Sequence, residues 1–128
     1  MLSGSQMFSS FAVDDVEEAR RFYGSTLGLD VRDGAEPGLI EIHGGRTPVM
    51  VYPKPDHEPA TFTVLNFPVP DIDAAVDSLI AAGVRMEQYD LENLHTDAKG
   101  IARGGGPKIA WFKDPAGNIL SVLETGRA

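Results

Sequence analysis

The sequence contains no cysteine among its 128 residues. This absence excludes disulfides, thiolate nucleophiles, iron–sulfur clusters and cysteine-ligated zinc sites. Basic residues are also scarce, because 11 lysines and arginines stand against 19 acidic residues and leave a formal net charge of −8. Such a chain repels phosphate backbones and anionic membrane surfaces, so we expect no nucleic acid and no membrane as partners.

Long apolar runs are missing as well. No stretch approaches the roughly 18 apolar residues of a membrane span, and residues 1–11 lack the basic start and apolar core of a secretory signal. We therefore expect a cytoplasmic protein. The share of hydrophobic residues, 42%, and of charged residues, 23%, is typical of a globular chain. The length predicts one domain over residues 1–128.

The most informative feature that is present is an internal repeat. The segment 11–19, FAVDDVEEA, returns as FPVPDIDAA at 67–75, with Phe, Val, Asp, an aliphatic residue and Ala at matching places. Each copy predicts a strand followed by a helix, and Gly28 and Gly83 supply the left-handed stop after each helix. The predicted modules occupy residues 6–53 and 61–126, with a linker at 54–60.

Each helix begins at an aspartate that can accept the free N–H groups of the first turn, Asp14 or Asp15 in the first module and Asp71 in the second. With the leading strands at 8–13 and 61–69, the predicted plan is βαβββ, twice. The strands after the helices are expected at 29–32, 39–43, 49–53, 84–88, 108–113 and 119–124. Segment 89–107 is too long for a hairpin connection, and loops of that length are usually functional lids or disordered.

This plan, with the runs FAVDDVEEARRFYGSTLGLDV, FPVPDIDAAVDSLIAAGV and AWFKDPAGNILSVLE, resembles the vicinal oxygen chelate superfamily. That group comprises glyoxalase I, bleomycin resistance proteins and extradiol dioxygenases. The resemblance implies an α+β fold in which two tandem βαβββ modules form a curled mixed sheet, a half-barrel cup with the helices outside and the ligand inside. It also implies a homodimer, with modules that pair within one chain or across two. Function does not follow from the fold, since one fold hosts many activities.

Metalloenzymes of the family hold one divalent ion through His and Glu side chains at four inward strand positions. The resemblance maps three of these positions onto Phe8, Val64 and Ser121, and the fourth near Met50 or Tyr52, where the strand register stays open. Phenylalanine and valine carry no ligand atom, and a neutral serine is a poor ligand by itself. We therefore predict no metal ion and no cofactor.

The remaining site candidates are an acid–base pair and a ligand-binding set. Glu41 and His43 share one strand face and are candidates for catalysis, since a histidine titrates near neutrality, but a solvated strand end is the simpler interpretation. The aromatic residues can stack on a planar ligand or only fill the core, and just one of Trp111 and Phe112 can face the cup. The predicted ligand-binding residues are Phe8, Tyr52, Val64, Asn66, Trp111 and Ser121.

Segment 89–107 carries further charged residues. His95 lies among acidic residues that could clasp a cation, but a solvated acidic loop is the simpler interpretation. Lys99, Arg103 and Lys108 flank three glycines and could receive an anion, although solvated charge explains them as well. The sequence does not choose between these alternatives.

Three functional hypotheses follow. The first is a metal-free protein that binds a small organic molecule and sequesters it or confers resistance to it. The second is an enzyme of the same fold, a lyase, an isomerase or an oxidoreductase such as a dioxygenase, metal-dependent or metal-free, with non-standard site residues such as His43 and Glu41. The third is an interaction domain whose cup is filled by its own side chains. Whether any reaction is catalysed stays open at this point.

Overall fold

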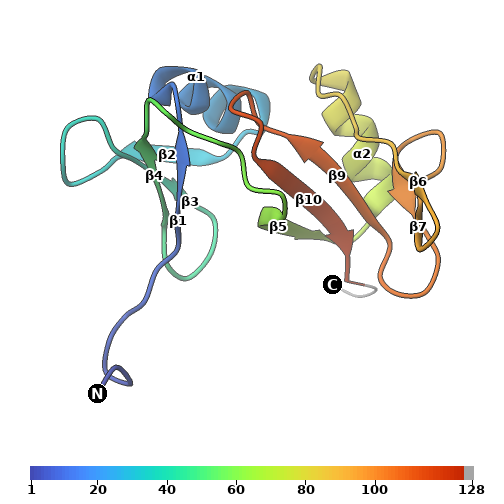
Figure 1. Ribbon diagram of the computed structural model, residues 1–128, viewed down its shortest axis with the longest axis horizontal. Coiled ribbons are helices and arrows are strands. Elements are labelled where there is room, and N and C mark those ends of the chain that lie inside the picture. The colour runs from blue at the N-terminus through green and yellow to red at the C-terminus, as the bar shows by residue number, and fades with distance from the viewer. Residues whose placement is uncertain (126–128) are drawn as a thin grey trace. The chain divides into compact units, whose positions relative to one another are not determined.

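The computed structural model describes residues 1–125 and divides into two compact units, residues 1–58 and a unit that begins at Pro59 (Figure 1). Residues 126–128 lie outside the described residues. They include the end of the predicted module 61–126 and the end of the predicted domain. Each unit contains a four-stranded mixed sheet with a helix packed on it. The predicted α+β class with two tandem modules is confirmed, whereas the single-domain organisation and the module boundaries stay predictions.

In the first unit, the first strand runs parallel to the last strand, and the other pairs are antiparallel. The strand order is β1-β4-β3-β2. Strands 49–53 and 39–43 of the sequence prediction match the observed strands to within one residue. The elements are β1 (Ser10–Val13), α1 (Val16–Arg20), η1 (Arg21–Thr26), β2 (Asp30–Asp33), β3 (Ile40–His43) and β4 (Val49–Pro53).

The first helix begins where the sequence predicts it, and Asp15 rather than Asp14 is its cap. The Asp15 carboxylate accepts a hydrogen bond from the backbone N–H of Glu18 at 3.1 Å. After Arg20 the α-helix continues as the π-helix η1, in which the fully buried Tyr23 packs its ring edge-to-face on Phe11 of β1. This aromatic contact places the helix on the Phe11 side of the sheet.

The second unit repeats the plan, with β5 parallel to β10 and the strand order β5-β10-β9-β8. Asp71 caps its helix as predicted, because its carboxylate accepts from the N–H of Ala74 at 3.2 Å. A separate two-stranded hairpin, β6 with β7, lies between α2 and β8 in the sequence. The elements are β5 (Thr63–Val69), α2 (Ile72–Ala81), β6 (Asp90–Leu91), β7 (Leu94–His95), β8 (Ile101–Ala102), β9 (Ile109–Lys113) and β10 (Ile119–Glu124).

The prediction of a strand at 84–88 is wrong. Only Met86 forms a bridge, opposite Phe112 of β9, and the next part of the same β9 edge pairs with Ile101 of β8. Two segments far apart in the sequence therefore share one edge of β9. The fourth strand of this sheet comes from within segment 89–107, which the sequence analysis assigned to a loop.

The turn between β9 and β10 is built around Asp114, which is buried. Its Oδ1 atom accepts from the backbone N–H groups of Ala116 at 3.0 Å and Asn118 at 2.8 Å, and its Oδ2 accepts from the Asn118 amide. Gly117 has a φ of +88°, and a Cβ there would lie 2.8 Å from the Pro59 ring. These constraints explain why this turn needs Asp, Gly and Asn in this order.

Side-chain alternation gives each sheet one face against its helix and one face turned away from it, which we call the open face. Val51 and Ile40 on the helix face of the first unit are fully buried, as are Leu120 and Ala110 in the second. Glu124 also lies on the helix face, because its Oε2 atom accepts the N–H of Ile72 at the start of α2. Among residues 1–125 no helix has the length and apolar character needed to cross a bilayer.

We predict that Leu120→Ala lowers the free energy of unfolding by about 3 kcal/mol, because it leaves a cavity in the helix face of β10. Leu91→Ala is the matched control, since Leu91 is 62% exposed and its truncation should cost less than about 0.5 kcal/mol. Urea denaturation measures both values. Equal effects of the two substitutions would contradict this division of core and surface.

Candidate functional site

Three of the predicted ligand-binding residues form one row across the open face of the second unit. The register of the sheet places Asn66 of β5 and Trp111 of β9 on either side of Ser121 in β10. The buried Ser121 hydroxyl donates a hydrogen bond to Oδ1 of Asn66 at 2.5 Å. Asn66 is exposed and Trp111 is half-buried. The row therefore presents an amide and an indole ring on either side of the buried serine.

Trp111, and not Phe112, belongs to the open face. Phe112 is buried on the helix face, as the alternation of a strand requires. The Trp111 ring meets the ring of Tyr89 edge-to-face, with centroids 5.5 Å apart. Burial raises the pKa of Tyr89, and the charge of Glu87 adds to the effect. Sequence reasoning missed Tyr89, because nothing in the pattern of segment 89–107 links it to β9.

Val64 lies beside this row, where the pairing of β5 with β10 is irregular. Ile119 lies opposite Thr63, but the next residue, Leu120, lies opposite Leu65, so the register skips Val64. The Val64 side chain is half-buried. It lies two residues from Asn66 along the same strand.

On the open face of the first unit, the sheet brings Glu41 and His43 into contact. Oε1 of Glu41 lies 3.0 Å from Nε2 of His43, and the two side chains are only 26% and 27% exposed. This pair is more enclosed than the solvated strand end that the sequence analysis favoured. Asp30 lies opposite His43 and Arg32 opposite Glu41, so each of these two acidic side chains faces a basic residue type on the other strand.

Within this group, Arg32 and Asp30 neutralise one another. Nη2 of Arg32 lies 2.7 Å from Oδ2 of Asp30. The hydrogen bond from Arg32 lowers the pKa of Asp30, and the same contact raises the pKa of Arg32. The charge of Glu41 adds to the rise in the pKa of Arg32, so the two groups interact across the strand pair. The hydrogen-bonding contact of Glu41, however, is with His43.

A hollow of about 200 Å³ lies on the open face of the first unit. Its charged wall is Glu41, and its apolar walls include Phe8 and Met50. Tyr52, predicted as a ligand-binding residue, lies two residues from Met50 on the same strand face and is partly exposed, but it does not line the hollow. The hollow is lined by Gln6, Phe8, Glu41, Thr47, Pro48 and Met50.

The strand register identifies the fourth family metal position, which the sequence analysis placed near Met50 or Tyr52. The internal repeat aligns Ser10 with Asn66. Ser10 lies opposite Met50 in the parallel pair β1–β4, and Asn66 lies opposite Ser121 in the parallel pair β5–β10. Met50 is therefore the counterpart of Ser121.

The four positions do not fit the divalent ion of the metalloenzymes. Phe8 and Val64 carry no ligand atom, and the thioether of Met50 is a soft ligand suited to other metals. The Ser121 hydroxyl already donates to Asn66. Within the described residues, no group of three or more histidine or acidic side chains could hold a metal ion. These residues therefore do not form the metal site of the metalloenzymes.

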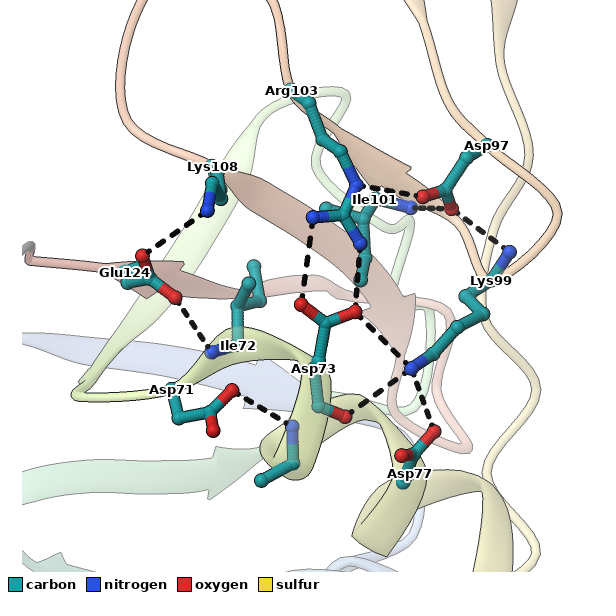
Figure 2. A network of polar contacts seen from close by, with 11 residues as sticks. Asp71, Ile72, Asp73, Asp77, Asp97, Lys99, Ile101, Arg103, Lys108 and Glu124 are labelled. Carbon is teal, nitrogen blue, oxygen red and sulfur yellow. Dashed lines mark hydrogen bonds and ion pairs between the residues drawn. The ribbon is translucent and has the colours of Figure 1, made fainter.

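The cations of segment 89–107 are bound by carboxylates of the same unit, as Figure 2 shows. Nη2 of Arg103 lies 2.7 Å from Oδ1 of Asp73 on α2, and its Nε lies 2.9 Å from Oδ2 of Asp97. Nζ of Lys99 lies 2.8 Å from Oδ1 of Asp77. These side chains tie the segment to α2 and are not free to receive an anion.

Hydrogen bonds from Arg103 and then Lys99 lower the pKa of Asp73. Burial acts to raise the pKa of Asp97, but the N–H groups of Ile101, Arg103 and Lys99 outweigh it and lower the pKa. Asp73 and then Asp97 raise the pKa of Arg103 in turn. All these shifts favour the charged forms, so the network is intact at neutral pH.

A second hollow, of about 450 Å³, lies between the β6–β7 hairpin and β8. Its polar wall includes His95, whose Nδ1 lies 2.9 Å from Oδ1 of Asp90, together with Asp97 and Arg103 of the network. The carboxylate of Asp97 accepts from the backbone N–H groups of Lys99 and Ile101 as well as from Arg103. His95, Asp97 and Arg103 therefore already have partners within the same unit.

Comparison with known proteins identifies relatives by family and by fold. The family model described as the Glyoxalase/Bleomycin resistance protein/Dioxygenase superfamily matches residues 7–122. A comparison with curated protein sequences finds no match.

Solved structures share the fold at low sequence identity. A lactoylglutathione lyase from Agrobacterium tumefaciens is 19% identical with a TM-score of 0.66, and the match covers 97% of this chain and 96% of that chain. TnmS3, described as an antibiotic binding protein from a Streptomyces species, is 22% identical with a TM-score of 0.65, over 94% and 97%. A superfamily member from Sphaerobacter thermophilus is 24% identical with a TM-score of 0.65, over 92% and 96%.

The network around Asp73 predicts a pH-dependent stability. Asp73→Asn removes its ion pairs, so the backbone amides of residues 97–103 should exchange hydrogen several-fold faster at pH 7.

The folded protein lowers the pKa of Asp73. The contribution of Asp73 to stability is therefore present above the ordinary aspartate pKa of about 4, and it is lost as the pH falls through the lowered value. The difference in urea midpoint between wild type and variant should therefore shrink from pH 6 to pH 3.

Asp14→Asn is the control, because Asp14 is exposed and makes no ion pair within the described residues. It should change neither the exchange of residues 97–103 nor the pH dependence. An Asp73→Asn variant with unchanged exchange in this segment would show that the network does not hold it.

Proposed function

Because its residues 7–122 match that family model, the chain belongs to the Glyoxalase/Bleomycin resistance protein/Dioxygenase superfamily, and we propose that it is a metal-free member that binds a small organic molecule. In this proposal the protein sequesters the compound or confers resistance to it, and no cofactor takes part. The observation that carries the proposal is the chemistry of the four family metal positions. They hold Phe8, Met50, Val64 and Ser121 in place of His and Glu.

The row on the open face of the second unit supports a planar ligand with a hydrogen-bond acceptor. Oδ1 of Asn66 is occupied by the Ser121 hydroxyl, and the described residues offer no partner for the N–H groups of the same amide. Those two donors are available to a carbonyl or ring nitrogen of a ligand. The half-buried indole of Trp111 provides a face on which the ligand ring can stack. Ser121 fixes the amide orientation, so little entropy is lost when the ligand binds.

The fold is compatible with this activity, since a protein of similar structure is described as binding an antibiotic. Similarity at 22% identity supports the fold and leaves the ligand to be identified. The ligand class proposed for the second unit therefore comes from Asn66 and Trp111 and not from the neighbour.

A second candidate function is a metal-free acid–base enzyme, a lyase or isomerase of the same fold. The contact between Glu41 and His43 favours it, because a carboxylate and an imidazole 3.0 Å apart can pass a proton between them. A structural neighbour described as a lactoylglutathione lyase shares the fold. Turnover of a substrate that is abolished by Glu41→Gln would favour this candidate over simple binding.

The remaining expectations concern assembly and location. The homodimer and the cytoplasmic location stay predictions, as does the absence of nucleic-acid and membrane partners. The strongly acidic net charge of −8 is the observation on which the last of these rests.

The binding proposal is tested by tryptophan fluorescence. The chain has a single tryptophan, so a change in its emission reports on Trp111 alone. We expect planar heteroaromatic compounds to quench this emission and to raise the melting temperature. Asn66→Ala should weaken binding of the best compound about tenfold, the effect of one lost hydrogen bond. Asn93→Ala is the matched control, because Asn93 is exposed and lies between β6 and β7, and it should leave the affinity unchanged.

Equilibrium dialysis against Ni²⁺, Zn²⁺, Mn²⁺ and Fe²⁺, each used separately, completes the test. We expect far less than one metal ion per chain. Stoichiometric binding of any of these ions, or a compound library in which nothing changes Trp111 emission, would overturn the proposal.

A further inference from the structure

The hollow beside β1 differs chemically from the row around Trp111. Glu41 is the only formally charged residue among the six that line it, and the apolar part of its wall includes Phe8, Met50 and Pro48. A hollow lined by a carboxylate, an aromatic ring and a thioether is a poor environment for an anion. A cation, in contrast, is attracted by the carboxylate, by the face of the ring and by the polarizable sulfur.

We propose that this hollow binds a small organic ammonium ion, and that His43 makes the binding depend on pH. The inference deepens the proposed function by naming a ligand class for the first unit. At about 200 Å³ the hollow suits a ligand with a single ring or a short alkyl chain. An ammonium group can donate to the carboxylate of Glu41, while the ligand's apolar part lies against Phe8 and Met50.

The position of His43 supplies the pH dependence. Its Nε2 atom lies 3.0 Å from Oε1 of Glu41. The imidazole and a bound ammonium group would therefore interact with the same carboxylate. Histidine side chains change charge between pH 5 and 8. When His43 is protonated, its positive charge neutralises Glu41 and repels the ligand, so binding is weaker at low pH.

The other charged groups near the pair interact with it by charge alone, Asp30 with His43 and Arg32 with Glu41, and they make no hydrogen bond to it. From β2, Asp30 lies opposite His43 and Arg32 lies opposite Glu41, and these two neutralise each other at 2.7 Å. From β4, the neighbour of Glu41 is the uncharged Met50. The segment before β1 contributes Gln6 and Phe8, and the turn before β4 contributes Thr47 and Pro48, none of which is charged.

The test uses benzylamine, which is a cation between pH 5.5 and 8, and two analogues of the same shape, neutral benzyl alcohol and anionic benzoate. Binding is followed by NMR chemical shifts of the full chain. We expect benzylamine to shift the amides of β3 and β4 saturably, and the two analogues to bind at least tenfold more weakly. Equal binding of benzyl alcohol, or tighter binding of benzoate, would overturn the proposal.

Glu41→Gln should weaken benzylamine binding about tenfold or more. Glu36→Gln is the matched control, because Glu36 is an exposed carboxylate of the same unit that does not line the hollow. Phe8→Ala should also weaken binding, and since the Phe8 side chain is 59% exposed, this variant tests the hollow even if Glu41→Gln fails to fold. Unchanged affinity in both variants would overturn the proposal.

The role of His43 has its own readout. Wild-type affinity for benzylamine should fall several-fold from pH 8 to pH 5.5, and His43→Gln should remove that dependence while it keeps binding at pH 8. A wild-type affinity that is the same at both pH values would overturn the pH coupling. Trp111 fluorescence distinguishes the two proposals, because a compound that quenches it in the Glu41→Gln variant supports the second-unit row whatever the outcome for benzylamine.

Discussion

In both units the first strand pairs in parallel with the last strand, and this pairing decides which side chains meet. It places Ser10 opposite Met50 in one sheet and Asn66 opposite Ser121 in the other. Parallel neighbours need a long crossover connection, and here the connection includes a helix that covers one face of the sheet. The opposite face is not covered by that helix. Every candidate for ligand binding lies on or beside such an open face, and each residue's neighbours follow from the register of the parallel pair.

The chemistry of the open faces departs from that of the family's metalloenzymes through a few side chains. Phe8, Met50 and Val64 replace ligands with apolar groups, and Ser121 keeps an oxygen that hydrogen bonds to Asn66. The positions that carry ligands in the metalloenzymes here present a ring and a thioether in the first unit, and an isopropyl group and a hydroxyl in the second. A fold can change its activity in this way without change to its core, because the helix face and the open face use alternate residues of the same strands.

Some of the acidic residues have a structural role. In the second unit, Asp73 and Asp97 bind Arg103, and Asp77 binds Lys99, so acidic side chains of α2 hold the segment that carries β8. These ion pairs connect α2 with the segment that carries β8. On the first unit, Glu41 is the one acidic residue among the six that line the hollow, and its carboxylate also contacts His43.

Local sequence patterns predicted much of this fold and failed where two distant segments share one partner. Asp71 as a helix cap, strand 119–124 and the rule that Trp111 and Phe112 face opposite sides follow from short-range rules of capping and alternation. Strand 84–88 was predicted wrongly, because alternation at Met86 cannot reveal that β8 occupies the rest of the same edge. Tyr89 was missed for the same reason, since only its packing on Trp111 gives it a role.

The sequence by itself determined the repeat, the α+β class, the family resemblance and the lack of metal-ligating residues at Phe8, Val64 and Ser121, because these depend on residue identity and local order. Only the tertiary structure decided that Met50 is the counterpart of Ser121 and that Ser121 donates a hydrogen bond to Asn66. It also decided that Glu41 both contacts His43 and lines a hollow. The physical reason is that strand register is a property of two strands together, and a shift by one residue would turn each of these side chains to the other face.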